Sequence, residues 1–179
     1  MDIIPAEAKH LPAIQQIYAW HVLHGTGSFE SEPPTEAEMA GRLKKIQQAG
    51  LIWLVAVEGV DVKGYCYLMP YRPRFAYRFT LENAVYVDPT YQQRGAGRAL
   101  LDRAIAWATE HGYRQLIANV GDSENRGSLG LHQAAGFSVM GTLHAVGFKH
   151  GRWLDTVLMQ CPLGENSETL PAINSAPSS

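Results

Sequence analysis

Apolar residues recur at intervals of three and four in several stretches of the chain, and this spacing predicts helices with one buried face. The clearest stretch carries Leu101, Ala104, Ile105 and Ala108, and it predicts a helix that ends near His111. Similar spacing predicts helices over about 6–22 and from Thr35 to near residue 50. Thr35 and Glu38 have the spacing of a capping box. A fourth helix is expected from about 125 to 135.

Short apolar runs bounded by turn residues predict strands between these helices. The expected strands lie near 3–4, 51–58, 63–69, 80–87, 115–120, 138–144 and 153–160. The order is strand, two helices, three strands, helix, strand, helix and two strands. It predicts an α/β (α+β) domain with one twisted mixed sheet of about six to seven strands, flanked by about four helices.

The length and composition indicate one globular domain. We place it at residues 1–163, because from Gly164 onward the chain is rich in Ser, Pro, Asn and Glu and offers little to bury. Residues 164–179 are therefore expected to form a disordered tail. No internal repeat or linker divides the remainder.

Charge and cysteine content argue against several classes of protein. A formal net charge of -2 gives no electrostatic basis for binding nucleic acid or a membrane surface. No apolar run reaches transmembrane length, and the N-terminus does not read as a signal peptide. The two cysteines, Cys66 and Cys161, lack the spacing of a zinc site or a disulfide framework. We therefore expect a cytoplasmic protein that needs no metal.

Candidate chemistry centres on residues 84–101, where a strand is broken by Asp88-Pro89 and leads through a glycine-bearing loop into the helix described above. Free backbone N–H groups at a helix start suit a pyrophosphate. Gly95 and Gly97 permit close approach of the backbone, and Arg94 and Arg98 add positive charge. The loop lacks the Gly-Lys-Ser/Thr of a Walker motif and the third glycine of a dinucleotide fingerprint. An ordinary turn before a helix is the alternative.

The pattern Gln92-x-x-Gly95-x-Gly97 resembles the acyl-CoA pyrophosphate loop of the GNAT superfamily of N-acyltransferases. A second segment, from Asn125 through Ser128 and Leu131-His132 to Gly136-Phe137, resembles the superfamily helix that lies along the pantetheine arm of CoA. The resemblance implies the GNAT fold and acetyl-CoA as acetyl donor. It also implies a set of residues that hold the donor: Val85, Tyr86, Val87, Gln93, Arg94, Gly95, Ala96, Gly97, Arg98, Asn125 and Ser128.

Asn125, Ser128 and His132 are spaced by three and four, so they share one helix face. An amide and a hydroxyl there can bond the pantetheine amides. Asn125 can instead serve as an N-cap, and His132 can be a solvated polar position. Many members of the superfamily carry a tyrosine where this chain has His132. A histidine there can protonate a leaving thiolate or accept a proton.

Five segments are similar to the phosphinothricin and methionine sulfoximine N-acetyltransferases, and the similarity runs from about residue 2 to 160. They are Thr26–Phe29, Tyr71–Arg74, Leu81–Val87, Leu131–His132 and Gly147–Asp155. This resemblance implies that Glu82 and His132 are the acid/base residues. It also implies a homodimer, with the segment 148–153 near the subunit interface and the site.

The residues themselves support a base at Glu82. An amino group is protonated at neutral pH and must lose a proton before it becomes a nucleophile. Glu82 lies at the start of an otherwise apolar strand that leads to the phosphate loop, where a carboxylate is costly unless it is partnered or wet. In this superfamily a backbone N–H stabilises the thioester oxygen, and we place that donor at or near Val87.

Three further residues are predicted to bind substrate together with Glu82. Arg72 and Arg74 flank Pro73, and guanidinium groups can grip a carboxylate or a phosphinate. A solvated loop is the alternative for both. Phe29 is a large apolar residue among small ones, which suits either a core plug or a pocket wall.

The resulting hypothesis is a direct transfer of acetyl from acetyl-CoA to the α-amino group of methionine sulfoximine, methionine sulfone or phosphinothricin, which gives detoxification or resistance. Two alternatives remain. One is a GNAT enzyme that acetylates a polyamine, an aminoglycoside or a protein N-terminus. The other is a non-catalytic acyl-CoA sensor. An arginine-rich loop before Glu82 disfavours cationic substrates, and the presence of both Glu82 and His132 disfavours the sensor.

Overall fold

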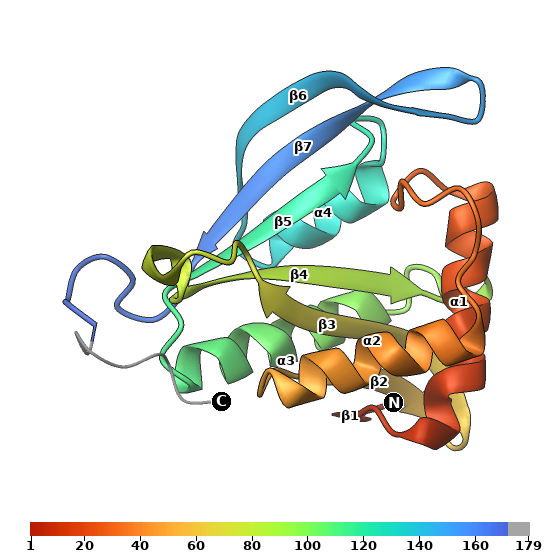
Figure 1. Cartoon of the computed structure of the whole chain (residues 1–179), viewed down its shortest axis with the longest axis horizontal. Helices are drawn as coiled ribbons and strands as arrows, with labels where there is room; N and C mark the ends of the chain where they lie inside the picture. The colour runs from red at the N-terminus through yellow and green to blue at the C-terminus, as the bar shows by residue number, and fades with distance from the viewer. Residues whose placement is uncertain (172–179) are drawn as a thin grey trace.

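The computed structural model describes residues 1–171, and these form one seven-stranded sheet with helices on both faces (Figure 1). The strand order is β1-β2-β3-β4-β5-β7-β6. In chain order the strands are β1 (Asp2–Pro5), β2 (Trp53–Glu58), β3 (Asp61–Pro70), β4 (Thr80–Val87), β5 (Gln115–Gly121), β6 (Ser138–Lys149) and β7 (Arg152–Pro162). Neighbouring strands are antiparallel except β4 and β5, which are parallel. The predicted mixed sheet is confirmed.

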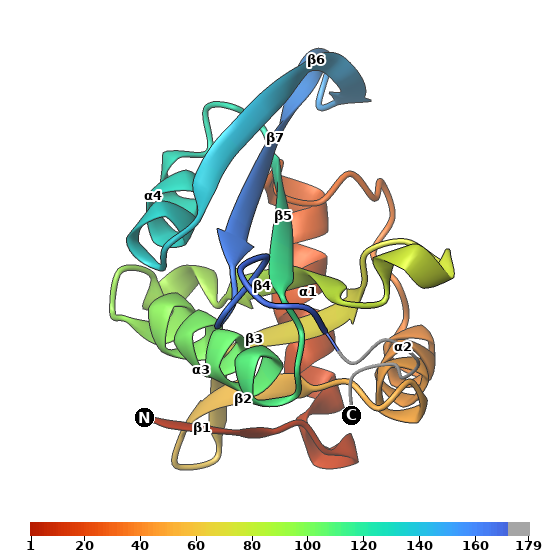
Figure 2. The ribbon, with the colours of Figure 1, turned by 90° about the vertical axis from the view of Figure 1, so that its left-hand side faces the viewer.

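Four α-helices cover this sheet: α1 (Leu11–His24), α2 (Glu36–Gln48), α3 (Ala96–Glu110) and α4 (Arg126–Ala134). Figure 2 shows α3 and α4 on one face of the sheet and α1 and α2 on the other. Three short 3-10 helices lie at Ala8–His10, Phe75–Tyr77 and Pro89–Tyr91. The core between the layers is apolar, and Ile14, Leu54, Leu100 and Met159 are each fully buried in it.

Two predicted boundaries were wrong. The first α-helix begins at Leu11 rather than near residue 6, because a 3-10 turn precedes it and Pro12 lies at its first turn. Proline there lacks an N–H that a helix start leaves unpaired in any case. Strands β6 and β7 extend beyond the predicted 138–144 and 153–160. The extra part of this hairpin is largely exposed, so burial does not mark it in the sequence.

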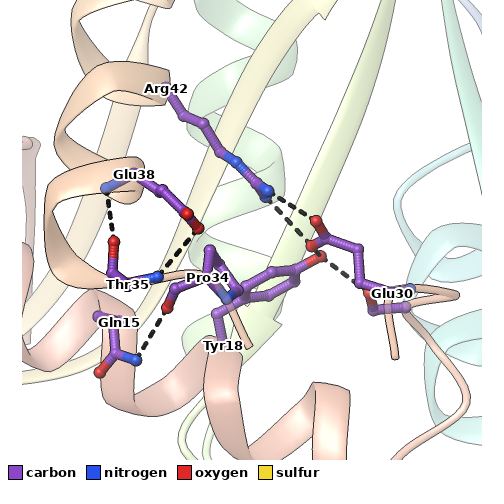
Figure 3. Close-up of polar contacts among 8 residues, drawn as sticks. Gln15, Tyr18, Glu30, Pro34, Thr35, Glu38 and Arg42 are labelled. Carbon is purple, nitrogen blue, oxygen red and sulfur yellow. Dashed lines mark hydrogen bonds and ion pairs between the residues drawn. The ribbon is translucent and has the colours of Figure 1, made fainter. Parts of the chain in front are cut away.

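The loop between α1 and α2 is held to both helices by polar contacts (Figure 3). Glu30 forms a two-pronged ion pair with Arg42 of α2, at 2.6 and 3.1 Å, and it accepts a hydrogen bond from the hydroxyl of Tyr18 on α1. The predicted capping box of α2 is present, with Thr35 and Glu38 bonded reciprocally at 3.1 Å. These contacts fix the course of residues 25–35 beside the sheet.

Phe29 in the same loop lies against two glycines of the sheet. A Cβ at Gly147 of β6 would come within 2.5 Å of the Phe29 ring, and a Cβ at Gly121 of β5 within 3.1 Å of it. A Cβ at Gly121 would also lie 2.5 Å from the carbonyl oxygen of Thr26. Glycine at both positions therefore lets the loop cross closely over the ends of β5 and β6.

Strands β4 and β5 pair over a short length and then diverge. The pairing joins Thr80, Leu81 and Glu82 to residues 115–117 and goes no further along the described strands. Hydrogen bonds from Tyr71 N to Thr80 O and from Asp88 N to Lys63 O show that even-numbered residues of β4 bond β3. The main-chain groups of odd-numbered residues therefore face β5. Beyond Glu82 they face the opening between the two strands.

Part of the segment expected to be a disordered tail is folded. Residues 164–168 form turns, and Arg114 Nη1 donates hydrogen bonds to Asn166 O at 2.7 Å and to Thr169 O at 3.1 Å. The expectation for 172–179 falls outside the described residues, and the domain boundary at 163 stays a prediction. No helix within residues 1–171 is both long and apolar enough to cross a membrane.

Candidate active site

A cavity of about 810 Å³ opens where β4 and β5 diverge. Its wall combines the end of α1 and the following loop, the strands β3, β4 and β5, the loop before α3, and the N-terminal part of α4. The cavity thus reaches both faces of the sheet through the gap between two parallel strands. This gap is the only part of the described sheet where neighbouring strands separate in this way.

The predicted phosphate loop forms one end of the cavity. Gln93 and Gly95 have positive φ angles of 59° and 84°, and α3 begins at Ala96 directly after Gly95. This backbone turns the first N–H groups of a 15-residue helix toward the cavity. Gly97 is tightly packed, because a Cβ there would lie 3.1 Å from Leu131 of α4 and 3.4 Å from Val87. The loop can therefore hold a pyrophosphate close to β4.

The two arginines of this loop differ in position. Arg98 lines the cavity, and its Nε also donates to Asp102 at 2.8 Å on the exposed side of α3. Arg94 lies outside the wall, with its guanidinium 5.0 Å from the centre of the Tyr91 ring. The predicted contact of Arg94 with the donor stays a prediction.

Helix α4 brings Asn125 and Ser128 to the opposite wall. Asn125 caps the helix, since its Oδ1 accepts from Ser128 N at 3.3 Å. Its Nδ2 donates to Gly121 O, also at 3.3 Å, which ties α4 to the end of β5. Both side chains line the cavity, so the capping role of Asn125 is compatible with a place beside an extended ligand.

His132 is buried at 3% exposure, and both of its ring nitrogens have protein partners. Nδ1 lies 2.7 Å from Ser128 O, and a carbonyl oxygen only accepts, so Nδ1 carries the hydrogen. Nε2 then accepts from Asn83 Nδ2 at 3.1 Å. Burial lowers the pKa of His132, an effect that the bond to Ser128 O partly opposes, and this favours the neutral ring.

Asn83 is itself 6% exposed, and among residues 1–171 its Oδ1 has no hydrogen-bond partner. The Asn83–His132 contact therefore fastens α4 to β4 inside the protein. This burial contradicts the alternative interpretation of His132 as a solvated polar position. Its predicted part in proton transfer stays a prediction, and any such transfer has to involve the Nε2 that faces Asn83.

Glu82 lies on the other face of the sheet from His132. Side chains alternate along β4, and Tyr86 contacts Tyr18 and His21 of α1 while Asn83 contacts α4. Glu82 therefore shares the α1 face with Tyr86. Its Oε1 accepts from Asn119 Nδ2 at 2.8 Å across the strand gap. The structure thus brings Glu82 and His132 to one cavity, from opposite sides.

Burial raises the pKa of the Glu82 carboxyl, and the hydrogen bond from Asn119 and the positive charge of Arg72 partly counter that rise. A carboxylate with a raised pKa in a cavity is suited to accept a proton near neutral pH. The free-energy cost of burying a charge in an apolar strand is reduced here, because the half-buried carboxylate has a hydrogen-bond partner and opens to the cavity.

Main-chain groups of Val85 and Val87 face the opening, since both residues are odd-numbered on β4. His21 Nε2 donates to Val87 O at 2.8 Å, and Gln92 Nε2 donates to the same oxygen at 3.3 Å. The N–H of Val87 points to the same side of β4 as this carbonyl, toward the opening. The carbonyl is engaged by two side chains, and the N–H can donate to a ligand oxygen. Val85, Tyr86 and Val87 all line the cavity.

The remaining predicted substrate residues lie outside the described cavity wall. Arg72 and Arg74 are exposed on the loop after β3, and Arg72 is near enough to Glu82 for their charges to interact. Phe29 packs on Gly121 and Gly147, and its neighbours Thr26 and Gly27 line the cavity in its place. Phe29 is 42% exposed, so the core-plug interpretation is wrong. Its predicted place in the substrate site stays a prediction.

The side chains of the wall that sequence reasoning missed include His21, Tyr67, Asn83 and Asn119. Asn83 and Asn119 are polar residues inside otherwise apolar strands, and that signal was available. The positions of His21 and Tyr67 depend on which helix and strand face the gap, which the chain order alone does not reveal. In the part of the chain that the structure describes, no group of His, Cys, Asp and Glu is arranged to hold a metal ion.

Comparison with known proteins adds independent findings. Residues 14–137 match the model of the "Acetyltransferase (GNAT) family". The chain is 55% identical over 161 residues to a phosphinothricin N-acetyltransferase of Alcaligenes faecalis, covering 90% of this chain and 82% of that one. It is 34% identical to an L-methionine sulfoximine/L-methionine sulfone acetyltransferase of Salmonella typhimurium, covering 93% and 97%. A phosphinothricin acetyltransferase from Sinorhizobium meliloti, solved with AcCoA, superposes with a TM-score of 0.95 at 41% identity, covering 99% and 96%.

Replacement of Gly97 by valine tests the phosphate loop. The added side chain would press on Leu131 and Val87 and crowd the start of α3. We expect the affinity for acetyl-CoA to fall by about tenfold or more, measured by calorimetric titration. Gly130→Val is the matched control, because a Cβ at Gly130 meets nothing within 4 Å. Equal affinities for the two variants would show that the donor does not use this loop.

Proposed function

The chain belongs to the GNAT acetyltransferase family, and on this premise we propose that it acetylates the α-amino group of a small amino acid analogue, with acetyl-CoA as donor. The candidate acceptors are phosphinothricin, methionine sulfoximine and methionine sulfone. The observation that carries the proposal is the Glu82 carboxylate, which lies partnered in the cavity on the strand that leads to the phosphate loop. The relatives act on acceptors of this kind, as their names state.

The donor fits the cavity described above. The helix start at Ala96, with Gly95 in a positive-φ conformation, offers N–H groups for the pyrophosphate. Asn125 and Ser128 lie along the wall where a pantetheine arm would run, and the main chain of Val85 and Val87 is open on the facing side. Acetyl-CoA supplies the acetyl group, whose carbonyl carbon bonds the amine nitrogen as its bond to sulfur breaks.

In this reaction Glu82 has the part of general base. The acceptor enters with a protonated amine, and Glu82, directly or through one water, takes a proton so that the nitrogen lone pair becomes available. The Val87 N–H is the proposed donor to the carbonyl oxygen, where negative charge develops. The departing thiolate of CoA takes up one proton, so the overall transfer releases one proton to solvent. His132 is our candidate to relay that proton: in the neutral ring Nε2 carries no hydrogen, so Nε2 first accepts a proton and then passes it to the thiolate.

The acceptor subsite lies on the α1 face of the sheet, beside Glu82. Tyr67 and Met69 of β3 line it and give an apolar surface for a methionine-like side chain. Arg72 brings positive charge to its mouth, which suits the carboxylate or phosphinate of the acceptor. The charge of Arg72 would repel a cationic polyamine or aminoglycoside there, and the two other carboxylates of the cavity wall, Asp122 and Glu124, are already paired with Arg152. This is the physical reason for ranking amino acid analogues first.

We also propose a homodimer in the cytoplasm. The β6–β7 hairpin carries several apolar side chains that are about half exposed or more, and a second copy of the chain is the occupant we assign to this surface. They are Val139, Met140, Leu143, Val146, Phe148 and Trp153. Light scattering should then give about twice the 19.7 kDa of one chain.

The proposed location in the cytoplasm is supported by the two free buried thiols, Cys66 and Cys161, which suit a reducing compartment.

The first experiment is a panel assay of CoA release, followed with a thiol reagent. The acceptors are phosphinothricin, methionine sulfoximine, methionine sulfone, the common amino acids, spermidine, an aminoglycoside and a peptide N-terminus. We expect turnover to be concentrated on the first three. Turnover confined to spermidine or the aminoglycoside would overturn the assigned acceptor class. Bound acetyl-CoA without turnover on any acceptor would favour the sensor alternative.

Glu82→Gln tests the base. The amide keeps a similar size but cannot accept a proton, so we expect kcat to fall by about 10²–10⁴ with acetyl-CoA affinity unchanged. In the unmodified enzyme, kcat/KM should decline as the pH falls through the raised pKa of Glu82, because only the ionised carboxylate is a base. The variant should lose that acid limb. A variant with unchanged turnover would remove Glu82 from the mechanism.

Arg72→Ala and Arg74→Ala form a matched pair that tests acceptor binding. Both side chains are exposed on one loop, but Arg72 is the one whose charge interacts with Glu82. We expect the KM for phosphinothricin to rise about threefold to tenfold in Arg72→Ala and to change less in Arg74→Ala. If neither KM changes, the loop is solvated and the acceptor is held elsewhere.

A further inference from the structure

Asn119 is placed by the register of two parallel strands. Glu82 is the last residue of β4 that pairs with β5, opposite Ile117. Asn119 follows two positions later on the same face of β5, where the strands have already separated. Its side chain therefore reaches back across the open gap, and its Nδ2 donates to Glu82 Oε1 at 2.8 Å. This is a direct contact between the proposed base and a residue on the neighbouring strand.

The chemistry of the two groups fixes the orientation of this contact. An ionised carboxylate only accepts hydrogen bonds, so the NH₂ end of the Asn119 amide must face it. The bond engages Oε1 and leaves Oε2 as the atom available for the proton of an amine. A hydrogen bond to a charged acceptor is stronger than one between neutral groups. The bond from Asn119 therefore fixes the position of the Glu82 carboxylate and favours its ionised form.

The other ionisable groups around Glu82 come from several elements. Arg72 follows β3 and favours the ionised carboxylate. Tyr67 on β3 has a raised pKa, chiefly because it is buried and to a small extent because of the negative charge of Glu82. His21 and His24 of α1 line the same cavity. Arg72 is exposed and therefore screened by solvent, so it holds Glu82 less firmly than a direct bond does. Asn119 is the neutral group that binds the carboxylate itself.

We propose that Asn119 is a positioning residue that keeps the Glu82 carboxylate ionised and aimed at the acceptor amine. The inference rests on the proposed role of Glu82 and deepens it. The competing interpretation is structural: the bond could merely bridge β4 and β5 where their main-chain pairing stops. The two interpretations differ in pH dependence, because a strand bridge stabilises the fold at every pH, whereas support of the base matters most when protons compete for the carboxylate.

The test compares pH profiles of kcat/KM with phosphinothricin for four proteins: the unmodified enzyme, Asn119→Leu, Asn119→Asp and Gln115→Leu. Leucine has a similar size and no donor, so Asn119→Leu should reduce kcat/KM about threefold to tenfold near pH 6 and by less than about twofold near pH 8.5. Aspartate places a second carboxylate beside Glu82, so Asn119→Asp should show the same change to a larger degree.

Gln115→Leu is the matched control for a strand bridge. Gln115 lies on the same strand, is not part of the cavity wall, and accepts from Gln160 Nε2 at 2.8 Å. Its loss should lower kcat/KM little and equally at all pH values. Adding Asn119→Leu to Glu82→Gln should cause no further pH-dependent loss, since the base is already absent.

Each failure has a separate signature. A uniform reduction at every pH in Asn119→Leu, with a lowered unfolding temperature, would show a structural bridge and overturn the inference. An unchanged profile in both Asn119 variants would overturn it too. Those results leave the role of Glu82 intact so long as Glu82→Gln remains inactive. Full activity of Glu82→Gln would instead remove the proposed base, and with it the reason for the role of Asn119.

Discussion

Parallel strands β4 and β5 hold together at Thr80–Glu82 and then separate, and this divergence is the constraint on which the remaining structure depends. An interior sheet strand normally has its main-chain groups paired on both sides, because unpaired buried N–H and C=O groups are costly. Here the main-chain groups of Asn83, Val85 and Val87 that face the opening have no strand partner on that side, and of these Val87 O accepts from His21 and Gln92. The cavity, the access to both faces of the sheet and the proposed oxyanion donor all arise from that one opening.

The opening also explains why the chemistry is divided between the two faces. In the proposed reaction, neighbouring residues of β4 have different roles. Glu82 lies on the α1 face, which is the proposed acceptor side, and Asn83 lies on the α4 face and bonds His132. The donor and the acceptor can therefore approach the same reacting atoms from opposite sides of the sheet. Proximity of this kind supplies a large part of the rate enhancement in a bimolecular transfer. The rigid strand between them sets the separation.

The sequence predicted the helices and strands well, because those features are local. The strand 80–87, the capping box at Thr35 and the glycine-bearing start of α3 each depend on a few adjacent residues. The hydrogen-bond partners were harder to predict. Asn119 meets Glu82 through strand register, and the burial of His132 depends on Asn83 of another element. The orientation of Arg94 toward Tyr91 and the packing of Phe29 on Gly121 and Gly147 likewise depend on contacts that the local sequence does not reveal.

The Phe29 ring packs so closely on the backbones of Gly121 and Gly147 that the size of the residue at each of these three positions limits the size of the other two. Variation at these positions is therefore expected to be correlated during evolution. A lineage that gains a side chain at 147 needs a smaller residue at 29, and the loop 25–27 would then sit differently over the cavity. Changes of acceptor preference can arise along this route with Glu82, Asn119 and the phosphate loop untouched.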